Sequence, residues 1–137
     1  MTRIKYSYDA MKYMSMLESL TGEKLKDCIV NEDITFVVQE NDMGKAIGKK
    51  GVNIKRMEGI FKKRIKLIEF NNNVAQFVGN LINPVKAKEI REEDGIVNIY
   101  ADDAKTKGML IGREKNRINS INEIVKRYFQ IKEVKVA

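Results

Sequence analysis

The chain has 137 residues, of which 43% are hydrophobic and 33% are charged. This is enough for one ordinary domain, or for two very small ones, with a packed core. No apolar run is long enough for a transmembrane helix, and the N-terminus lacks a hydrophobic signal core, so we expect a cytoplasmic protein. The lone cysteine, Cys28, and the absence of histidine exclude disulfides, most zinc sites and every histidine-based catalytic triad. We expect no metal and no cofactor.

The formal charge of +7 and the pI near 9.4 favour a polyanionic partner. The excess charge is concentrated between Met43 and Phe70, where nine basic residues against two acidic ones give +7. The rest of the chain therefore sums to zero. A charge run is often only a solvated helix face, but this one surrounds a glycine-rich loop, and that position favours a nucleic-acid contact.

The first half of the chain predicts a helix, two strands, two helices separated by the glycine loop, and a strand. The first helix covers residues 7–21, with Ser7 as its cap and Gly22 as its stop. Its apolar stripe consists of Ala10, Tyr13, Met14, Leu17 and Leu20. The strands are predicted at 25–31, 34–39 and 64–70.

The pattern restarts after the asparagine run at 71–73, which predicts a boundary. A helix over 74–82 ends before Pro84. Strands are predicted at 85–90 and 96–101, with 91–95 as the turn between them. Helices over 104–111 and 116–129 and a last strand over 131–136 complete the second half.

The two halves are related by an offset of 64 residues, which places Gly48 on Gly112. The same offset aligns apolar positions of the following helix and of the last strand. The pairs are Ile47 with Ile111, Ile54 with Ile118, Met57 with Ile121, Ile60 with Ile124, Phe61 with Val125, Leu67 with Ile131 and Phe70 with Val134. A match over a loop, a helix stripe and a strand indicates two tandem copies of one module.

The loop Gly48-Lys49-Lys50-Gly51 precedes a predicted helix. Glycine lets a ligand approach the main chain closely, and the free N–H groups at a helix start suit an anion. The two lysines add positive charge at the same place. A backbone phosphate fits this chemistry, although a plain glycine-rich turn between two helices is the alternative.

With Ile47 just before this loop and Ile54 just after it, the segment resembles the K-homology (KH) module. The order helix, strand, strand, helix, loop, helix, strand is that of the type II form. The resemblance implies an α+β fold of two tandem type II KH domains, residues 1–71 and 72–137, each a three-stranded sheet covered by helices. In the first copy the RNA-binding residues would be Lys45, Ile47, Gly48, Lys49, Lys50, Gly51, Ile54, Lys55 and Arg56.

In this interpretation, unpaired bases lie in a groove between the helix after the loop and the strand around residues 36–38. Lys45, Lys55 and Arg56 would add contacts to the RNA backbone. Ile47 and Ile54 can serve as core residues, as groove lining, or as both, and the sequence does not separate these roles.

The second loop reads Gly112-Arg113-Glu114-Lys115 and departs from the motif. Lys115 replaces the fourth-position glycine, and Glu114 places a negative charge near a bound phosphate. Arg113, Lys115 and Arg117 remain candidate RNA contacts, and Asn116 tolerates unusual backbone angles. We therefore expect the second copy to bind RNA less tightly than the first.

Three further stretches closely resemble the archaeal NusA-like transcription factors. They are residues 18–22 (Glu-Ser-Leu-Thr-Gly), 27–30 (Asp-Cys-Ile-Val) and 42–48 (Asp-Met-Gly-Lys-Ala-Ile-Gly). Residues 80–84, Asn-Leu-Ile-Asn-Pro, resemble the segment that those proteins carry between their two KH modules. The resemblance implies a monomeric factor that binds single-stranded RNA in transcription elongation and termination, with RNA polymerase as a candidate partner.

Two alternatives to a transcription factor were weighed. Another KH-type role, in ribosome assembly or rRNA handling, fits the same loop. A GTPase is excluded because no Gly-x-x-x-x-Gly-Lys-Ser/Thr phosphate loop is present. We expect no catalytic residues, because the acidic groups at 92–94 and 102–103 sit in predicted turns without a His or Cys nearby.

Overall fold

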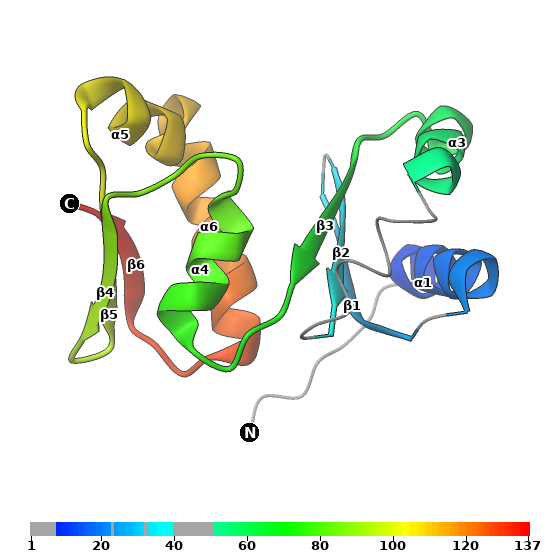
Figure 1. Cartoon of the computed structure of the whole chain (residues 1–137), viewed down its shortest axis with the longest axis horizontal. Helices are drawn as coiled ribbons and strands as arrows, with labels where there is room; N and C mark the ends of the chain where they lie inside the picture. The colour runs from blue at the N-terminus through cyan, green and yellow to red at the C-terminus, as the bar shows by residue number, and fades with distance from the viewer. Residues whose placement is uncertain (1–7, 23, 32, 40–50) are drawn as a thin grey trace. The chain divides into compact units, whose positions relative to one another are not determined.

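The computed structural model describes residues 8–22, 24–31, 33–39 and 51–137. They form two compact units, here called the first unit, which ends at Phe70, and the second unit, which runs from Asn71 to Ala137. Each unit contains a three-stranded sheet with helices (Figure 1). This is a mixed α+β architecture, as the sequence predicts.

The first unit contains α1 (Tyr8–Thr21), β1 (Leu25–Val30), β2 (Ile34–Val38), α3 (Gly51–Phe61) and β3 (Ile65–Glu69). The strand order is β1-β2-β3. β1 runs antiparallel to β2, and β3 runs parallel to it. Helices α1 and α3 lie on the same side of this sheet (Figure 1).

Helix α1 forms largely as predicted. Ala10 and Leu17 are buried, and Tyr13 and Met14 pack against the core. Gly22 adopts φ +70°, and its N–H donates to the Glu18 carbonyl at 2.8 Å, so the predicted stop is confirmed. Leu20 was wrongly placed in the buried stripe, because it lies on the outer side of the last turn and is 44% exposed. The predicted cap, Ser7, lies outside the described residues.

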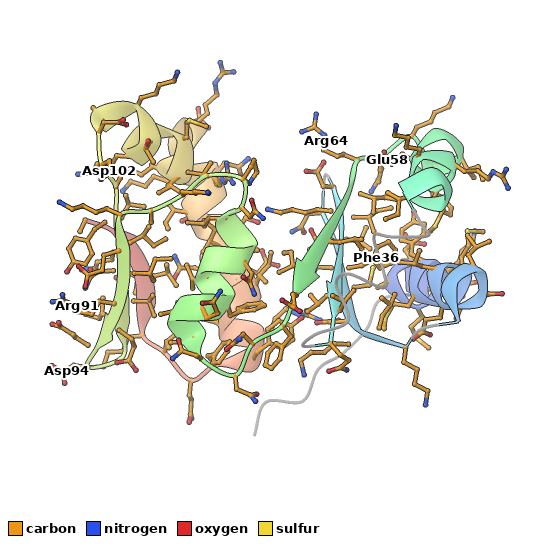
Figure 2. All side chains as sticks on the ribbon, in the orientation of Figure 1. Phe36, Glu58, Arg64, Arg91, Asp94 and Asp102 are labelled. Atoms are coloured by element: carbon orange, nitrogen blue, oxygen red, sulfur yellow. The ribbon has the colours of Figure 1, made fainter. Side chains whose placement is uncertain are left out.

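The core of the first unit lies between the sheet and its helices. It consists of Ala10, Leu17, Cys28, Ile34, Phe36, Met57 and Ile65. Cys28 is a buried thiol, which agrees with its expected role as a small apolar filler. Two glutamates connect helix ends to strand starts: Glu18 accepts from the Leu25 N–H at 2.7 Å, and Glu58 accepts from the Ile65 N–H at 2.8 Å. Phe36 and Glu58 are labelled in Figure 2.

The second unit contains α4 (Val74–Ile82), β4 (Glu89–Glu93), β5 (Ile96–Tyr100), α5 (Ala104–Ile111), the short 3-10 helix η1 (Arg113–Lys115), α6 (Asn116–Tyr128) and β6 (Glu133–Val136). Its strand order is β4-β5-β6, with β4 antiparallel and β6 parallel to the central strand. The first sheet has the same order and the same strand directions.

Short polar caps set the ends of the second unit's helices. The Asn73 side chain accepts from the Gln76 N–H at 3.1 Å, and the Asp103 carboxylate accepts from the Thr106 N–H at 2.7 Å. Asn83, directly before Pro84, is extended with ψ 138°, which ends α4 at Ile82. The predicted bounds of α4 and α5 are therefore confirmed.

The predicted position of strand β4 was wrong. The strand lies at Glu89–Glu93, and the turn before β5 consists only of Asp94 and Gly95. Both turn residues have positive φ, +53° and +82°. A two-residue loop of this kind matches the right-handed twist of the flanking strands and favours Asp-Gly. Three consecutive acidic residues suggested a longer turn, and the Asp-Gly signal was missed.

The internal repeat holds in the helices but not in the last strand. Central strands β2 and β5 are offset by 62 residues, since Ile34 pairs with Ile65 and Ile96 pairs with Glu133. The same pairs set β3 and β6 apart by 68 residues. The predicted strand pairs Leu67 with Ile131 and Phe70 with Val134 were therefore wrong. The second unit has a longer helix, α6, and a longer connection to its last strand.

Candidate nucleic-acid interface

The first glycine loop stands directly before helix α3. Lys45, Ile47, Gly48, Lys49 and Lys50 lie outside the described residues, and Gly51 is the first residue of α3. The predicted helix start is therefore confirmed. The N–H groups of its first turn have no intrahelical acceptors, and they carry the positive end of the helix dipole. Two lysines thus immediately precede a backbone that favours an anion.

Three predicted RNA-binding side chains fall inside α3. Lys55 and Arg56 are exposed, and no partner for either side chain occurs in the described part of the chain. Ile54 is half-buried and packs against the core of the first unit. Its core role is therefore confirmed, and its role in lining a groove stays a prediction.

The acidic residue within this basic stretch is occupied by the fold. Glu58 lies on α3, and its carboxylate accepts the Ile65 N–H at the start of β3 (Figure 2). Between Gly51 and Phe70 the chain carries six basic and two acidic residues, a net charge of +4. With Glu58 directed to the strand, Lys55 and Arg56 dominate the charge at the solvent-facing side of α3.

The groove expected beside β2 is not lined by exposed side chains. β2 is the central strand of its sheet, and Phe36, Val37 and Val38 are all buried. Phe36 belongs to the core between sheet and helices (Figure 2). The part of the prediction that gave these side chains to bases was wrong, because a central strand is covered by its neighbours and by the core.

The second loop requires glycine at its first position. Gly112 adopts φ +77° and ψ 173°. A Cβ placed there would lie 2.8 Å from the Arg117 Cβ and 2.9 Å from the Arg117 main-chain nitrogen. Any side chain would therefore collide with backbone that cannot move independently of helix α6.

The next residues close the loop into a tight turn. Glu114 and Lys115 both take left-handed conformations, with φ +54° and +62°. The Lys115 N–H donates to the Gly112 carbonyl at 3.3 Å. Asn116 has ordinary helical angles, so the unusual conformations fall on Glu114 and Lys115 and not on Asn116 as expected. Lys115 occupies the backbone region that glycine prefers.

The basic side chains of this loop have different surroundings. Arg113 and Lys115 are exposed, and no side-chain partner for either is found in the described part of the chain. Arg117 is half-buried, and its guanidinium donates to the Ile82 carbonyl at 3.3 Å. That carbonyl belongs to the last residue of α4, a position where an arginine donor is favourable. Arg117 thus has a structural role that the sequence did not indicate.

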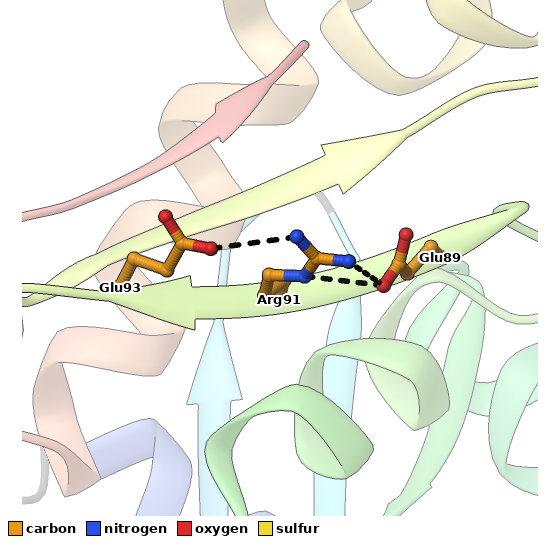
Figure 3. A network of polar contacts seen from close by, with 3 residues as sticks. All are labelled: Glu89, Arg91 and Glu93. Carbon is orange, nitrogen blue, oxygen red and sulfur yellow. Dashed lines mark hydrogen bonds and ion pairs between the residues drawn. The ribbon is translucent and has the colours of Figure 1, made fainter.

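Cations on the outer strand of the second sheet are neutralised. On β4, Arg91 lies between Glu89 and Glu93, at 2.6 Å and 3.5 Å (Figure 3). The hydrogen bond to Glu89 is the largest cause of a raised pKa for Arg91. Lys135 on β6 similarly lies 3.8 Å from Glu133. These cations are less suited to phosphate than Arg113 and Lys115.

Sequence reasoning missed Asn122, which connects α6 to β6. Its amide donates to the carbonyls of Ile118 and Val134, at 3.0 Å and 2.9 Å, and accepts the Val134 N–H at 2.8 Å. The repeat offset of 64 places Asn122 on Glu58, which makes the corresponding helix-to-strand bond in the first unit. That alignment was the available signal.

No group of His, Cys, Asp and Glu side chains in the described ranges is arranged to hold a metal ion. Nor does any described helix have the length and apolar character that crossing a bilayer requires.

Comparison with known proteins places this geometry in a family. Residues 13–90 match the family model of the KH domain. The chain is 30% identical to a probable transcription termination protein NusA from Methanococcus vannielii, over 98% of this chain and 80% of that protein. The chain belongs to the archaeal NusA-like KH family. The resemblance seen in the sequence is confirmed.

Other NusA-like relatives agree. A probable transcription termination protein NusA from Halococcus morrhuae is 28% identical over 98% of this chain and 99% of that protein. The crystal structure of APE1850 superposes with a TM-score of 0.73 at 27% identity, over 96% of this chain and all of that one. The KH match continues past Phe70 into α4 and β4. Because KH domains bind RNA, this NusA-like chain is an RNA-binding protein.

Proposed function

We propose that the chain acts in transcription elongation and termination by gripping single-stranded RNA through the Gly48–Gly51 loop. The observation that carries this proposal is the start of α3 at Gly51, directly behind Lys49 and Lys50, in a chain of the NusA-like KH family. The names of its relatives support a termination role, and the ribosome-assembly alternative has no comparable support.

The proposed grip is electrostatic. N–H groups at the start of α3 and the ammonium groups of Lys49 and Lys50 bind phosphate oxygens. Lys45, Lys55 and Arg56 add contacts along the strand, and Ile47 and Ile54 contact the sugar or base faces. Few aromatic side chains are available for stacking, so shape and backbone contacts provide most of the affinity.

We further propose that each unit is one type II KH domain, residues 1–71 and 72–137. The matching strand order and directions support this, as do the corresponding Glu58 and Asn122 bonds. In the second domain, Gly112, Arg113, Lys115 and Arg117 form the weaker RNA site. Glu114 repels phosphate there, and Arg117 is already engaged with Ile82.

The proposed partners are single-stranded RNA and RNA polymerase, and the proposed state is a cytoplasmic monomer. Binding of single-stranded RNA, duplex RNA and single-stranded DNA of one sequence would test the first partner. We expect single-stranded RNA to bind best. If about three phosphates are neutralised, affinity should fall about 20-fold between roughly 50 and 200 mM salt. Tighter binding of duplex RNA, or no salt dependence, would contradict the proposal.

Association with polymerase needs a separate measurement. Purified archaeal RNA polymerase, with nucleic acid removed by nuclease, should bind the chain and respond to it at a terminator. A chain that binds single-stranded RNA but changes neither pausing nor termination would leave the RNA function intact and exclude the transcription role.

A further inference from the structure

An aliphatic side chain on α3 is exposed where its counterpart is buried. Ile60 is 61% exposed, although it lies within a helix whose other side packs on the core. Ile124, at the repeat-related position of α6, is 5% exposed. The first unit therefore presents to solvent a position that the second unit uses for its core.

The residue before Ile60 is a glycine that the described fold does not require. Gly59 is exposed, and a Cβ placed on it would meet no heavy atom within 4 Å. Glycine inside an exposed helix destabilises it by about 0.5–1 kcal/mol relative to alanine. A glycine beside an exposed isoleucine lets the surface of another molecule approach the helix closely.

The surroundings of this pair are basic. Lys55 and Arg56 lie one helical turn before Gly59 and Ile60 and are exposed. The acidic side chain of α3, Glu58, is directed to the Ile65 N–H. The outward surface of α3, formed by Lys55, Arg56, Gly59 and Ile60, thus combines two cations, an aliphatic side chain and a flat site. We call it the α3 face.

We propose that the α3 face docks an acidic amphipathic helix of a protein partner. Ile60 would enter the apolar stripe of that helix, Gly59 would allow the close approach, and Lys55 and Arg56 would pair with its carboxylates. An RNA backbone would use the two cations, but it would gain little from an exposed isoleucine and has no need of Gly59. The features together therefore favour protein. This partner is additional to the RNA of the proposed function.

The test uses the full chain and a fluorescent peptide several helical turns long, with leucines at helical spacing and glutamates elsewhere. A second peptide with the same composition and scrambled leucines is the control ligand. We expect wild type to bind the patterned peptide better than the scrambled one. Ile60→Ser should weaken this binding about tenfold, because a buried aliphatic contact is lost.

Gly59→Leu is the sharper variant. Open space surrounds the Gly59 Cβ position, and leucine is a better helix former, so the fold should be at least as stable as wild type. The added side chain should nevertheless block the peptide and weaken binding about tenfold. Met109→Ser is the matched control, since Met109 is 47% exposed on α5. It should leave peptide binding unchanged. Both α3 variants should keep wild-type affinity for single-stranded RNA.

Several results would overturn the proposal. Wild type might as well be replaced by either variant if all bind the patterned peptide equally, or if wild type does not distinguish the two peptides. Parallel loss of RNA binding in Ile60→Ser and Gly59→Leu would assign the α3 face to RNA. Strong destabilisation by Ile60→Ser would show that Ile60 belongs to the core.

Discussion

At the scale of single residues, two glycines of the second unit show opposite requirements. Gly112 has positive φ, and a Cβ there would lie 2.8 Å from the Arg117 Cβ. Gly108 lies inside helix α5, and a Cβ there would meet no heavy atom within 4 Å. One glycine is therefore imposed by the loop, whereas the other is not required by the packing of the described residues.

Replacing each glycine by alanine separates these cases. Gly112→Ala should lower the free energy of unfolding by about 2–4 kcal/mol, because left-handed backbone strain and a steric collision add. Gly108→Ala should raise it by up to about 1 kcal/mol through helix propensity. Urea denaturation measures both. Equal effects of the two substitutions would show that the loop relaxes around a side chain.

Asp103 gives the second unit a pH-dependent cap. The hydrogen bond from the Thr106 N–H lowers the pKa of the Asp103 carboxyl. Its stabilising effect is therefore complete above the ordinary aspartate pKa and is lost as the pH falls through the lowered value. Asp103→Asn should keep the cap while removing this contribution to the pH dependence.

Urea midpoints of wild type and Asp103→Asn, measured from neutral to strongly acidic pH, test the sign of this effect. Wild type should lose more stability than the variant toward low pH. A variant curve parallel to that of wild type would mean that the cap does not depend on ionisation.

At the scale of elements, one side chain in each unit holds the last strand to the preceding helix. Asn122 makes three hydrogen bonds between α6 and β6, and Glu58 makes one between α3 and β3. Removing such a partner leaves a strand N–H without its acceptor, which is costly when the group is shielded from water.

Asn122→Ala should therefore lower the free energy of unfolding by about 2–3 kcal/mol, and Glu58→Ala by about 1–2 kcal/mol. Glu58→Gln retains an acceptor and should lose less than Glu58→Ala. Chemical denaturation of the three variants provides the comparison. If Glu58→Gln is as unstable as Glu58→Ala, the bond to Ile65 is not what stabilises this junction.

Element positions were predictable where local chemistry decides them. Gly22, Asn73, Asp103 and Pro84 sit at helix ends, so the bounds of α1, α4 and α5 followed from the sequence. The hairpin between β4 and β5 was misplaced because Glu92 and Glu93 were assigned to a turn, although strand pairing and the Asp94-Gly95 turn decide there. Acidic side chains tolerate an exposed outer strand, and composition alone did not show this.

The candidate site was predictable in its charge and helix start but not in its packing. The position of Gly51 at the start of α3 and the exposure of Lys55 and Arg56 followed from the pattern. The bond from Arg117 to Ile82 spans 35 residues, so no local pattern indicates it. The left-handed backbone of Glu114 and Lys115 was assigned to Asn116, because propensity favours asparagine there while the turn geometry sets the actual positions.

At the scale of the whole molecule, charge and loop chemistry distinguish the two units. Residues 43–70 carry a net charge of +7, and the complete Gly-x-x-Gly loop lies within them. The second unit replaces that motif with Gly112-Arg113-Glu114-Lys115, and its outer-strand cation Arg91 is paired on both sides. RNA affinity should therefore depend mainly on the first loop.

The most direct test of this account is RNA binding by Lys49→Asp/Lys50→Asp, compared with Arg113→Asp as the matched loop variant. Fluorescence anisotropy with a short single-stranded RNA gives the affinities, and circular dichroism confirms folding. The account predicts at least a tenfold loss for the first-loop variant, roughly the effect of reversing two phosphate contacts, and a smaller loss for Arg113→Asp. Wild-type affinity in the folded first-loop variant would show that the Gly-Lys-Lys-Gly segment is only a turn and would contradict the central claim.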